Sequence, residues 1–238
     1  MQSLYPNQPK ALVPVNGKPF IERQIEWLRR GGITDIHLAA GFMGEQIEDW
    51  AARRNNITVA REPEPRGTGG ALKYSESRIR TDPFLVVNGD TILPNLDFWN
   101  WPPSPQAFSA AAGSEKPVGT LTAHDSAQTR CEWEVVIAVV ESENADRYGT
   151  VDFDPNGRVT SFREKTDTAT GWINGGVYVM KKKVVQTLPP EQHSNLETDI
   201  FPALIAGNRL YARVTKPPLF DMGTPDGLKR LGEYFAGI

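Results

Sequence analysis

The sequence predicts an α/β fold, with a mixed and mainly parallel sheet flanked by helices. In the first half, apolar runs of strand length alternate with segments of helical periodicity, an order typical of parallel strands joined by right-handed crossovers. The second half is richer in strands and contains a hairpin signal. A length of 238 residues, with 39% hydrophobic and 23% charged residues, fits one globular domain over 1–238.

Each element of the first half has a local signal. Phe20, Ile21, Ile25 and Leu28 share one helix face, and the glycine pair at 31–32 ends that helix. The further elements expected are a strand over 36–40, a helix around 47–51, a strand over 57–60, a helix over 71–79 and a strand over 83–87. Before them, Pro9 and Pro14 bracket Lys10 and predict a stiff, extended segment.

The second half adds strands and two helix starts. Strands are expected over 134–142 and 171–180, and a hairpin turns at 155–157, where the sequence reads Pro-Asn-Gly. Ser194 and Glu197 have the spacing of a capping box for a helix over 196–207. Thr224 and Pro225 are typical of the first two positions of a last helix.

One segment has no sustained periodicity. Residues 98–133 hold four prolines and many small residues, which predicts an inserted surface loop. We expect this loop to be an insertion within the single domain, because its composition is not that of a linker between two domains.

Charge and composition exclude several classes of protein. The net charge of −3 provides no basic footprint for nucleic acid. The single cysteine, Cys131, excludes an internal disulfide and is typical of a reducing compartment. No apolar run approaches the length of a membrane span, and no signal peptide opens the sequence, so the expected location is the cytoplasm without membrane contact.

A glycine-rich turn lies between the expected strand at 57–60 and the following helix. The segment REPEPRGTGGAL over 61–72 contains Gly67, Thr68 and Gly69. Backbone amides and a helix N-terminus there can bind an anion or the edge of a nucleotide base. Glycines in such turns are also common for steric reasons alone, so both interpretations stay open.

Two aspartates follow expected strands. Asp90 comes just after a buried strand in VVNGDT, where open α/β sheets bind ligands, and Asp221 lies before the last helix in FDMGTPDGL. Mg²⁺ prefers one or two protein carboxylates together with phosphate oxygens and water, so the pair could hold this ion beside a triphosphate. The simpler alternative is that each aspartate only organises its turn.

Two further motifs lie in the second half. Glu164 and Lys165 follow a hairpin strand and could contact a sugar hydroxyl and a phosphate, although such pairs are usually solvated. Asn174, Gly175 and Gly176 interrupt a strong strand, which indicates either the close approach of a ligand or a β-bulge.

The order of these motifs resembles the sugar-1-phosphate nucleotidyltransferase family. The motifs are PKALVPVNGKPFIE, EPEPRGTGGAL, NGDT, RYGTVDFDPNGRVTSFREK, INGGVYVM, LETDIFP and FDMGTPDGL. They cover nearly the whole chain apart from 99–133. The combination of RYGTV, REK, INGGVY and EPxxGTGGA is most similar to the D-glycero-α-D-manno-heptose 1-phosphate guanylyltransferase branch.

The resemblance implies a fold of the nucleotide-diphospho-sugar transferase type, Rossmann-like, and a role for each matched residue. Lys10 would contact the nucleotide phosphates, and Asp90 and Asp221 would bind Mg²⁺. The expected base-reading residues are Glu62, Gly67, Thr68 and Gly69. The expected sugar-phosphate pocket is formed by Gly149, Glu164, Lys165, Asn174 and Gly175.

The reaction implied is transfer of a nucleoside monophosphate from a nucleoside triphosphate, with GTP favoured, to a sugar 1-phosphate, with a heptose favoured. The sugar phosphate attacks the α-phosphorus in line and pyrophosphate leaves. Such chemistry depends on positioning and charge neutralisation more than on a general base. A homodimer is the expected assembly.

One part of the family pattern has no match. In the family, a first strand and a loop of the form GGxGTRL precede the lysine segment, whereas this sequence opens with MQSLYP. We therefore expect that the first strand is missing, that the chain is N-terminally truncated and that its activity is impaired. The alternatives are a non-catalytic, sugar-nucleotide-binding regulatory protein and a hexose-1-phosphate nucleotidyltransferase. A nicotinamide-dependent dehydrogenase is disfavoured, because no GxGxxG motif follows a first strand.

Overall fold

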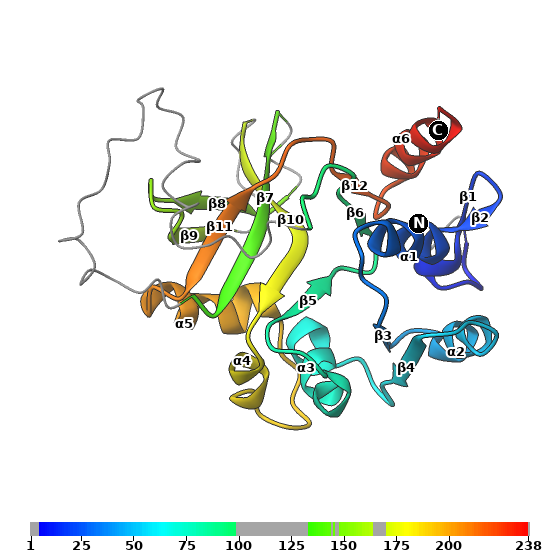
Figure 1. Cartoon of the computed structure of the whole chain (residues 1–238), viewed down its shortest axis with the longest axis horizontal. Coiled ribbons are helices and arrows are strands. Elements are labelled where there is room, and N and C mark those ends of the chain that lie inside the picture. The colour runs from blue at the N-terminus through cyan, green and yellow to red at the C-terminus, as the bar shows by residue number, and fades with distance from the viewer. Residues whose placement is uncertain (1–4, 99–132, 144, 146–147, 164–169, 238) are drawn as a thin grey trace.

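The computed structural model describes residues 5–98, 133–143, 145, 148–163 and 170–237 (Figure 1). The expected inserted loop lies almost wholly outside these residues, as do Glu164 and Lys165. The elements of the first half are β1 (Pro14–Val15), β2 (Lys18–Pro19), α1 (Phe20–Arg30), β3 (Ile36–Ala40), α2 (Gly44–Ala51), β4 (Ile57–Arg61), α3 (Gly67–Tyr74), β5 (Phe84–Val87) and β6 (Thr91–Ile92). Those of the second half are β7 (Val135–Ser142), β8 (Thr150–Phe153), β9 (Val159–Arg163), β10 (Gly171–Met180), α4 (Lys182–Gln186), α5 (Phe201–Ala206), β11 (Leu210–Val214), β12 (Phe220–Asp221) and α6 (Pro225–Ala236).

The predicted α/β class is confirmed. Six strands form one sheet in the order β11-β7-β10-β8-β9, with β5 paired to β10 as well. Parallel ladders join β11 to β7 and β3 to β4, whereas β5, β7 and β8 run antiparallel to β10. The hairpin predicted around residues 155–157 is the antiparallel β8–β9 pair.

Alternating side chains of β7 enter two different cores. Val135, Ile137 and Val139 pack with residues of α4 and α5, whereas Ala138 and Val140 pack with residues of α1 and α6. This alternation follows from the two-residue period of a strand, which sends successive side chains to opposite faces of the sheet. Figure 1 shows α1 and α6 on one side of these strands and α4 and α5 on the other.

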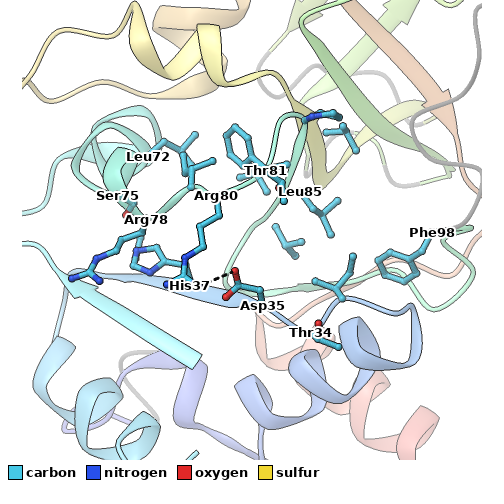
Figure 2. Close-up of a pocket in the computed structure, with 18 of the residues that line it drawn as sticks. Thr34, Asp35, His37, Leu72, Ser75, Arg78, Arg80, Thr81, Leu85 and Phe98 are labelled. Atoms are coloured by element: carbon cyan, nitrogen blue, oxygen red, sulfur yellow. Dashed lines mark ion pairs between the residues drawn. The ribbon is translucent and has the colours of Figure 1, made fainter. Parts of the chain in front are cut away.

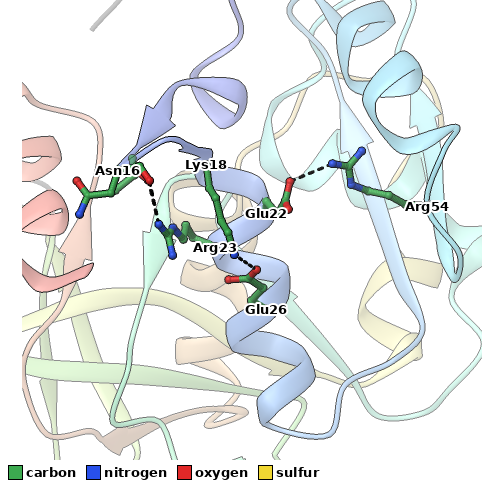
Figure 3. Close-up of polar contacts among 7 residues, drawn as sticks. Asn16, Lys18, Glu22, Arg23, Glu26 and Arg54 are labelled. Atoms are coloured by element: carbon green, nitrogen blue, oxygen red, sulfur yellow. Dashed lines mark hydrogen bonds and ion pairs between the residues drawn. The ribbon is translucent and has the colours of Figure 1, made fainter. Parts of the chain in front are cut away.

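The outward face of α1 is held by polar contacts (Figure 3). Lys18 pairs with Glu26 at 2.6 Å, and Arg54 pairs with Glu22 at 2.9 Å. Arg23 donates to the backbone carbonyl of Asn16 at 3.2 Å. These contacts tie α1 to the β1–β2 hairpin and to the end of α2, so the buried face of α1 is fixed against the core.

Three local predictions are wrong. Lys10 does not lie in extended backbone: residues Lys10–Leu12 form one 3₁₀ turn, in which the amide of Leu12 donates to the carbonyl of Pro9. Helix α3 begins at Gly67 rather than at residue 71, and it ends at Tyr74. Gly67, with φ +73°, makes this early start compatible with the sharp turn that precedes the helix.

The third wrong prediction is the capping box of Ser194 and Glu197. The backbone amide of Asn195 donates to the Asp199 carboxylate at 2.7 Å, and the Glu197 carboxylate accepts from the Tyr178 hydroxyl instead. The segment Leu196–Ile200 is a π-helical turn that leads into α5. By contrast, the prediction for α6 is confirmed, since the Thr224 side chain accepts from the amide of Gly227 and Pro225 is the first helical residue.

Strands β3 and β5 do not pair with each other in the described part of the chain. Among the described strands, β3 pairs only with β4 and β5 only with β10, so one edge of each has no strand partner. A cavity of about 490 Å³ lies between them, lined by β3, β5, α3 and Phe98 (Figure 2). Most of this lining is apolar, with Asp35, Arg80 and His37 among its polar residues.

None of the described helices is long and apolar enough to cross a membrane.

Candidate active site

The candidate site lies where β3, β4 and β5 end. Gly41 follows β3, Glu62 follows β4, and the turn Asn88–Gly89–Asp90 joins β5 to β6. In open α/β sheets, this carboxyl edge of the parallel strands is where ligands bind. Glu62 and Asp90, two of the sequence-predicted residues, therefore follow strands at the edge of the fold where such chemistry is expected.

Asp90 faces Lys10 and Asp221. The Lys10 Nζ atom lies 3.8 Å from Oδ2 of Asp90, with the two side chains 48% and 34% exposed. The antiparallel β12–β6 pair places Asp221 opposite Thr91, and the amide of Met222 donates to the carbonyl of Asp90 at 3.0 Å. The two aspartates that are far apart in the sequence thus converge in space.

The electrostatics of Asp90 fit a cation-binding carboxylate. Burial raises the pKa of Asp90 above its usual range, the negative charge of Asp221 raises that pKa further, and Lys10 opposes both effects. A carboxylate whose charged form is disfavoured in this way is stabilised by a bound divalent cation. No group of three or more His, Cys, Asp or Glu side chains capable of holding a metal occurs in the described residues. A pair of carboxylates still suits Mg²⁺, which takes most of its ligands from phosphate and water.

Asp221 also organises its own turn. Its Oδ1 atom accepts from the backbone amide of Gly223 at 2.6 Å, just before α6. One oxygen of the Asp221 carboxylate is therefore engaged by the backbone of its own turn, which agrees with the simpler alternative that Asp221 organises this turn. The same contact orients the carboxylate, and an oriented ligand loses less entropy on binding a metal.

Gln24 is a site residue that sequence reasoning missed. It is only 7% exposed, and its Nε2 atom donates to the carbonyls of Asn88 and Thr91 at 2.8 and 2.7 Å. The two bonds hold the turn that carries Asp90. A signal for this role was available, because Gln24 is a polar residue on the apolar stripe of the predicted helix.

The glycine-rich turn is closed by residue 194. The amides of Gly69 and Gly70 donate to the carbonyl of Ser194 at 2.8 and 3.2 Å, and the Ser194 amide donates to the carbonyl of Arg66. These contacts occupy the amides of Gly69 and Gly70, and a side chain at Gly69 would meet Ser194 and Ile200; the base-reading role of Gly69 stays a prediction. Thr68 is exposed at the first turn of α3, where amides have no partner within the helix.

Glu62 has an unusual environment. Its Oε1 atom is buried without a hydrogen-bond partner in the described residues, and its Oε2 atom lies next to Gly41. Burial raises the pKa of Glu62, while the positive charge of Arg66 lowers it. A buried acceptor without a donor is costly unless a ligand supplies one.

The glycines of β10 form a bulge. The register between β10 and β7 shifts between Asn174 and Tyr178, and Gly176 has φ +64°. The Asn174 side chain donates to the Tyr178 hydroxyl at 2.8 Å and accepts from the Gly176 amide at 2.9 Å. The bulge alternative is therefore confirmed.

The bulge also lies beside Gly149, so the three described members of the predicted sugar-phosphate pocket are close together. The amide of Asn174 donates to the carbonyl of Gly149 at 3.1 Å, and Gly175 packs closely against Ala138. The predicted roles of Gly149, Asn174 and Gly175 at a sugar phosphate stay predictions.

Comparison with known families identifies the class of protein. Residues 113–234 match the nucleotidyl transferase family, and residues 2–101 match the MobA-like NTP transferase domain. The chain therefore belongs to the nucleotidyl transferase family, and the resemblance to the sugar-1-phosphate nucleotidyltransferases is confirmed.

Several individual relatives of this chain are named as guanylyltransferases. The chain is 25% identical over 233 residues to a D-glycero-α-D-manno-heptose 1-phosphate guanylyltransferase from Aneurinibacillus thermoaerophilus, covering 97% of this chain and 90% of the relative. It is 31% identical to a mannose-1-phosphate guanyltransferase from Schizosaccharomyces pombe, covering 91% of this chain and 56% of that protein. HddC from Yersinia pseudotuberculosis, solved as a complex with GMP-PN, has a TM-score of 0.73 and 29% identity, covering 96% of this chain and 90% of that chain.

Proposed function

We propose that this chain transfers a guanylyl group from GTP to a sugar 1-phosphate in the presence of Mg²⁺, with a heptose 1-phosphate as the first candidate acceptor. The observation that carries the proposal is the convergence of Lys10, Asp90 and Asp221. A lysine and two carboxylates at the carboxyl edge of a sheet suit a magnesium triphosphate.

The chain's own residues account for most steps of the reaction. An oxygen of the sugar phosphate forms a bond to the α-phosphorus of GTP, the bond from that phosphorus to the bridging oxygen breaks, and pyrophosphate leaves with the electron pair. The attacking oxygen is already an anion, so no side chain has to remove a proton. Lys10 would hold the phosphates, and Asp90 and Asp221 would hold Mg²⁺, which when bound neutralises the charge of the phosphates.

Glu62 supports the choice of guanine. Guanine presents two adjacent donors, the ring N1–H and the exocyclic N2 amino group, and a carboxylate can accept from both. The buried oxygen of Glu62 that has no partner in the described residues would gain one in this way. Uracil and thymine offer one ring donor and no neighbouring amino group, so they would leave part of the carboxylate unpaired.

Resemblance to the two kinds of guanylyltransferase supports this substrate class. The heptose and mannose enzymes named above share the type of donor and differ in the sugar. The sugar-side residues Glu164 and Lys165, which would separate a heptose from a hexose, lie outside the described residues. Heptose over mannose is therefore the part of the proposal that rests on resemblance alone.

We also expect slow turnover. Lys10 is the basic side chain that contacts Asp90 in the described part of the site, and it brings one positive charge to a triphosphate with about four negative ones. Loss of even one preorganised donor from such a site costs on the order of 100-fold or more in rate. The open edges of β3 and β5 mark where an additional strand with a phosphate-binding loop would be accommodated.

The test is transfer of label from α-labelled GTP to a panel of sugar 1-phosphates: D-glycero-D-manno-heptose, mannose and glucose. We expect labelled GDP-sugar at a low rate, more with GTP than with UTP or dTTP. Glu62→Gln should weaken the preference for GTP, because its amide nitrogen repels the N1–H and N2 donors. A version extended by a strand and a GGxGTRL loop should be at least about 100-fold faster. Turnover of the 238-residue chain at ordinary rates would contradict the expected impairment.

A regulatory function is the second candidate, because one lysine and an open sheet also suit binding without catalysis. Tight binding of GDP-mannose, with no label transfer by either the original or the extended chain, would favour it. It would exclude the transferase proposal.

A further inference from the structure

A chain of side-chain hydrogen bonds connects the glycine-rich turn to the bulge in β10. Glu197, in the π-helical turn before α5, accepts from the Tyr178 hydroxyl at 3.1 Å through Oε1. Its Oε2 atom lies 3.5 Å from the Thr68 hydroxyl, which in turn accepts from the amide of Leu196 at 2.8 Å. The Tyr178 hydroxyl accepts from Asn174 at 2.8 Å. These four residues form what we call the Glu197 relay: Thr68, Glu197, Tyr178 and Asn174.

The central residue of the relay, Tyr178, belongs to the hydrophobic core. Tyr178 is fully buried, and its ring packs against Phe201 of α5 with ring centroids 5.6 Å apart. Burial and the negative charge of Glu197 raise the pKa of the Tyr178 hydroxyl far above its usual range, so the hydroxyl stays protonated and donates to Glu197. Because packing fixes the ring, the hydroxyl can hold Glu197 and Asn174 in one arrangement.

The two ends of the relay lie in different halves of the proposed site. Thr68 belongs to the turn expected to meet the nucleotide, and Asn174 belongs to the bulge expected to meet the sugar phosphate. The backbone amide of Asn88 donates to the carbonyl of Gly176 at 2.8 Å, so the turn that carries Asp90 is also joined to the bulge. The motifs that meet at Tyr178 are thus separated by more than a hundred positions in the sequence.

We infer that Glu197 is a positioning residue that couples binding of the nucleotide to binding of the sugar phosphate through Tyr178. The inference rests on the proposed function and adds to it a residue whose predicted role, as a helix cap, proved wrong. Ordering of Thr68 by a bound nucleotide would fix Glu197, and through Tyr178 it would fix Asn174 before the sugar phosphate arrives. The second ligand then has less conformational entropy to lose, and its affinity rises.

Four variants, compared with the parent chain, distinguish this positioning role from a merely structural one. Glu197→Ala removes both contacts, and Tyr178→Phe removes the hydroxyl while keeping the ring. Glu197→Gln keeps an acceptor for Tyr178 and places a donor toward Thr68, so it should rescue the parent behaviour. Tyr211→Phe is a matched control, because Tyr211 is also buried and its hydroxyl accepts from Arg158 at 3.2 Å outside the relay.

The measurement is the affinity for mannose 1-phosphate, titrated with and without a saturating non-hydrolysable GTP analogue and Mg²⁺. In the parent chain, the analogue should strengthen mannose 1-phosphate binding by at least about 5-fold, the lower end of ordinary coupling. We expect this factor to fall to about 1 in Glu197→Ala and Tyr178→Phe, and to persist in Glu197→Gln and Tyr211→Phe. A thermal melt of each variant establishes that the protein titrated is folded.

Each other result is decisive. Binding of both ligands without coupling in the parent, or unchanged coupling in folded Tyr178→Phe, would refute the relay and leave the proposed function intact. If coupling were also lost in Tyr211→Phe, removal of any buried tyrosine hydroxyl would have the same effect, and the relay would be refuted. If the parent binds neither ligand, the proposed function fails and the relay with it.

Discussion

Replacement of Asp90 by Asn should make the ligand-free protein more stable. Asp90 is a partly buried carboxylate whose pKa is raised by burial and by the charge of Asp221, so its negative charge carries a net free-energy cost in the folded state. Its ion pair with Lys10 is long, at 3.8 Å, and both side chains are partly exposed, so little stabilisation is lost with the charge.

The size of the effect follows from these contacts. Repulsion and desolvation at a site that is about one-third exposed amount to on the order of 1 kcal/mol after solvent screening. For a chain of this length, 1 kcal/mol changes the melting temperature by about 2–4 °C. Asp90→Asn should therefore melt about 2–4 °C above the parent at pH 7.5 in EDTA.

The pH dependence has a defined sign. Because the folded-state pKa of Asp90 is raised, the parent's disadvantage is present at neutral pH and disappears as the pH falls through that pKa, when the folded carboxyl becomes neutral. The two melting curves should converge under acidic conditions. In Mg²⁺ and GTP the order should reverse, because only the parent gains stability from the bound metal.

The assay is differential scanning fluorimetry of the parent, Asp90→Asn and the control Asp49→Asn, which changes an exposed carboxylate of α2. The reasoning would be refuted if Asp90→Asn melted below the parent in EDTA at neutral pH. It would equally be refuted if Asp49→Asn reproduced both the gain in EDTA and the loss in Mg²⁺ and GTP.

Three further predictions concern residues around the site. Gln24→Leu should lower the free energy of unfolding by about 1–3 kcal/mol, because the carbonyls of Asn88 and Thr91 lose their donor; equilibrium denaturation measures this. Thr224→Ala should cost about 1 kcal/mol through loss of the α6 cap, whereas Thr224→Ser should cost little in the same assay. Burial, aided by Arg78, lowers the pKa of His37, so stability should fall as the pH drops below about 6.5, and His37→Gln should flatten that slope in melts from pH 7.5 to 5.

Much of the fold was predictable because its signals are local. The helix from Phe20 to Arg30 and the strand from Gly171 to Met180 match their predicted bounds, and the turn at 155–157 matches its hairpin. In each case, apolar periodicity or turn chemistry within a few residues determines the element. The convergence of Asp90 and Asp221 was also predictable, since each lies at the end of an expected strand; in the structure Asp221 ends β12, which pairs with β6 next to Asp90.

Three of the failures involve partners distant in the sequence. Helix α3 starts at Gly67 because the carbonyl of Ser194 meets its first amides, a contact that no local pattern contains. Glu197 has the spacing of a capping residue, yet Tyr178 offers it a buried hydroxyl. Gln24 has two carbonyl acceptors that only the folded Asp90 turn presents. Tertiary contacts override local preferences at each of these positions.

The central claim is that Asp90 and Asp221 hold Mg²⁺ for a guanine nucleotide. Its most direct test is the affinity of the 238-residue chain for GTP, measured by calorimetric titration in Mg²⁺ and in EDTA, for the parent, Asp90→Asn and Asp221→Asn. We predict that Mg²⁺ strengthens GTP binding to the parent by about tenfold or more, or about 1.4 kcal/mol, and that each variant loses this gain. Equal affinities in Mg²⁺ and EDTA for the parent, or an undiminished gain in both variants, would contradict the claim.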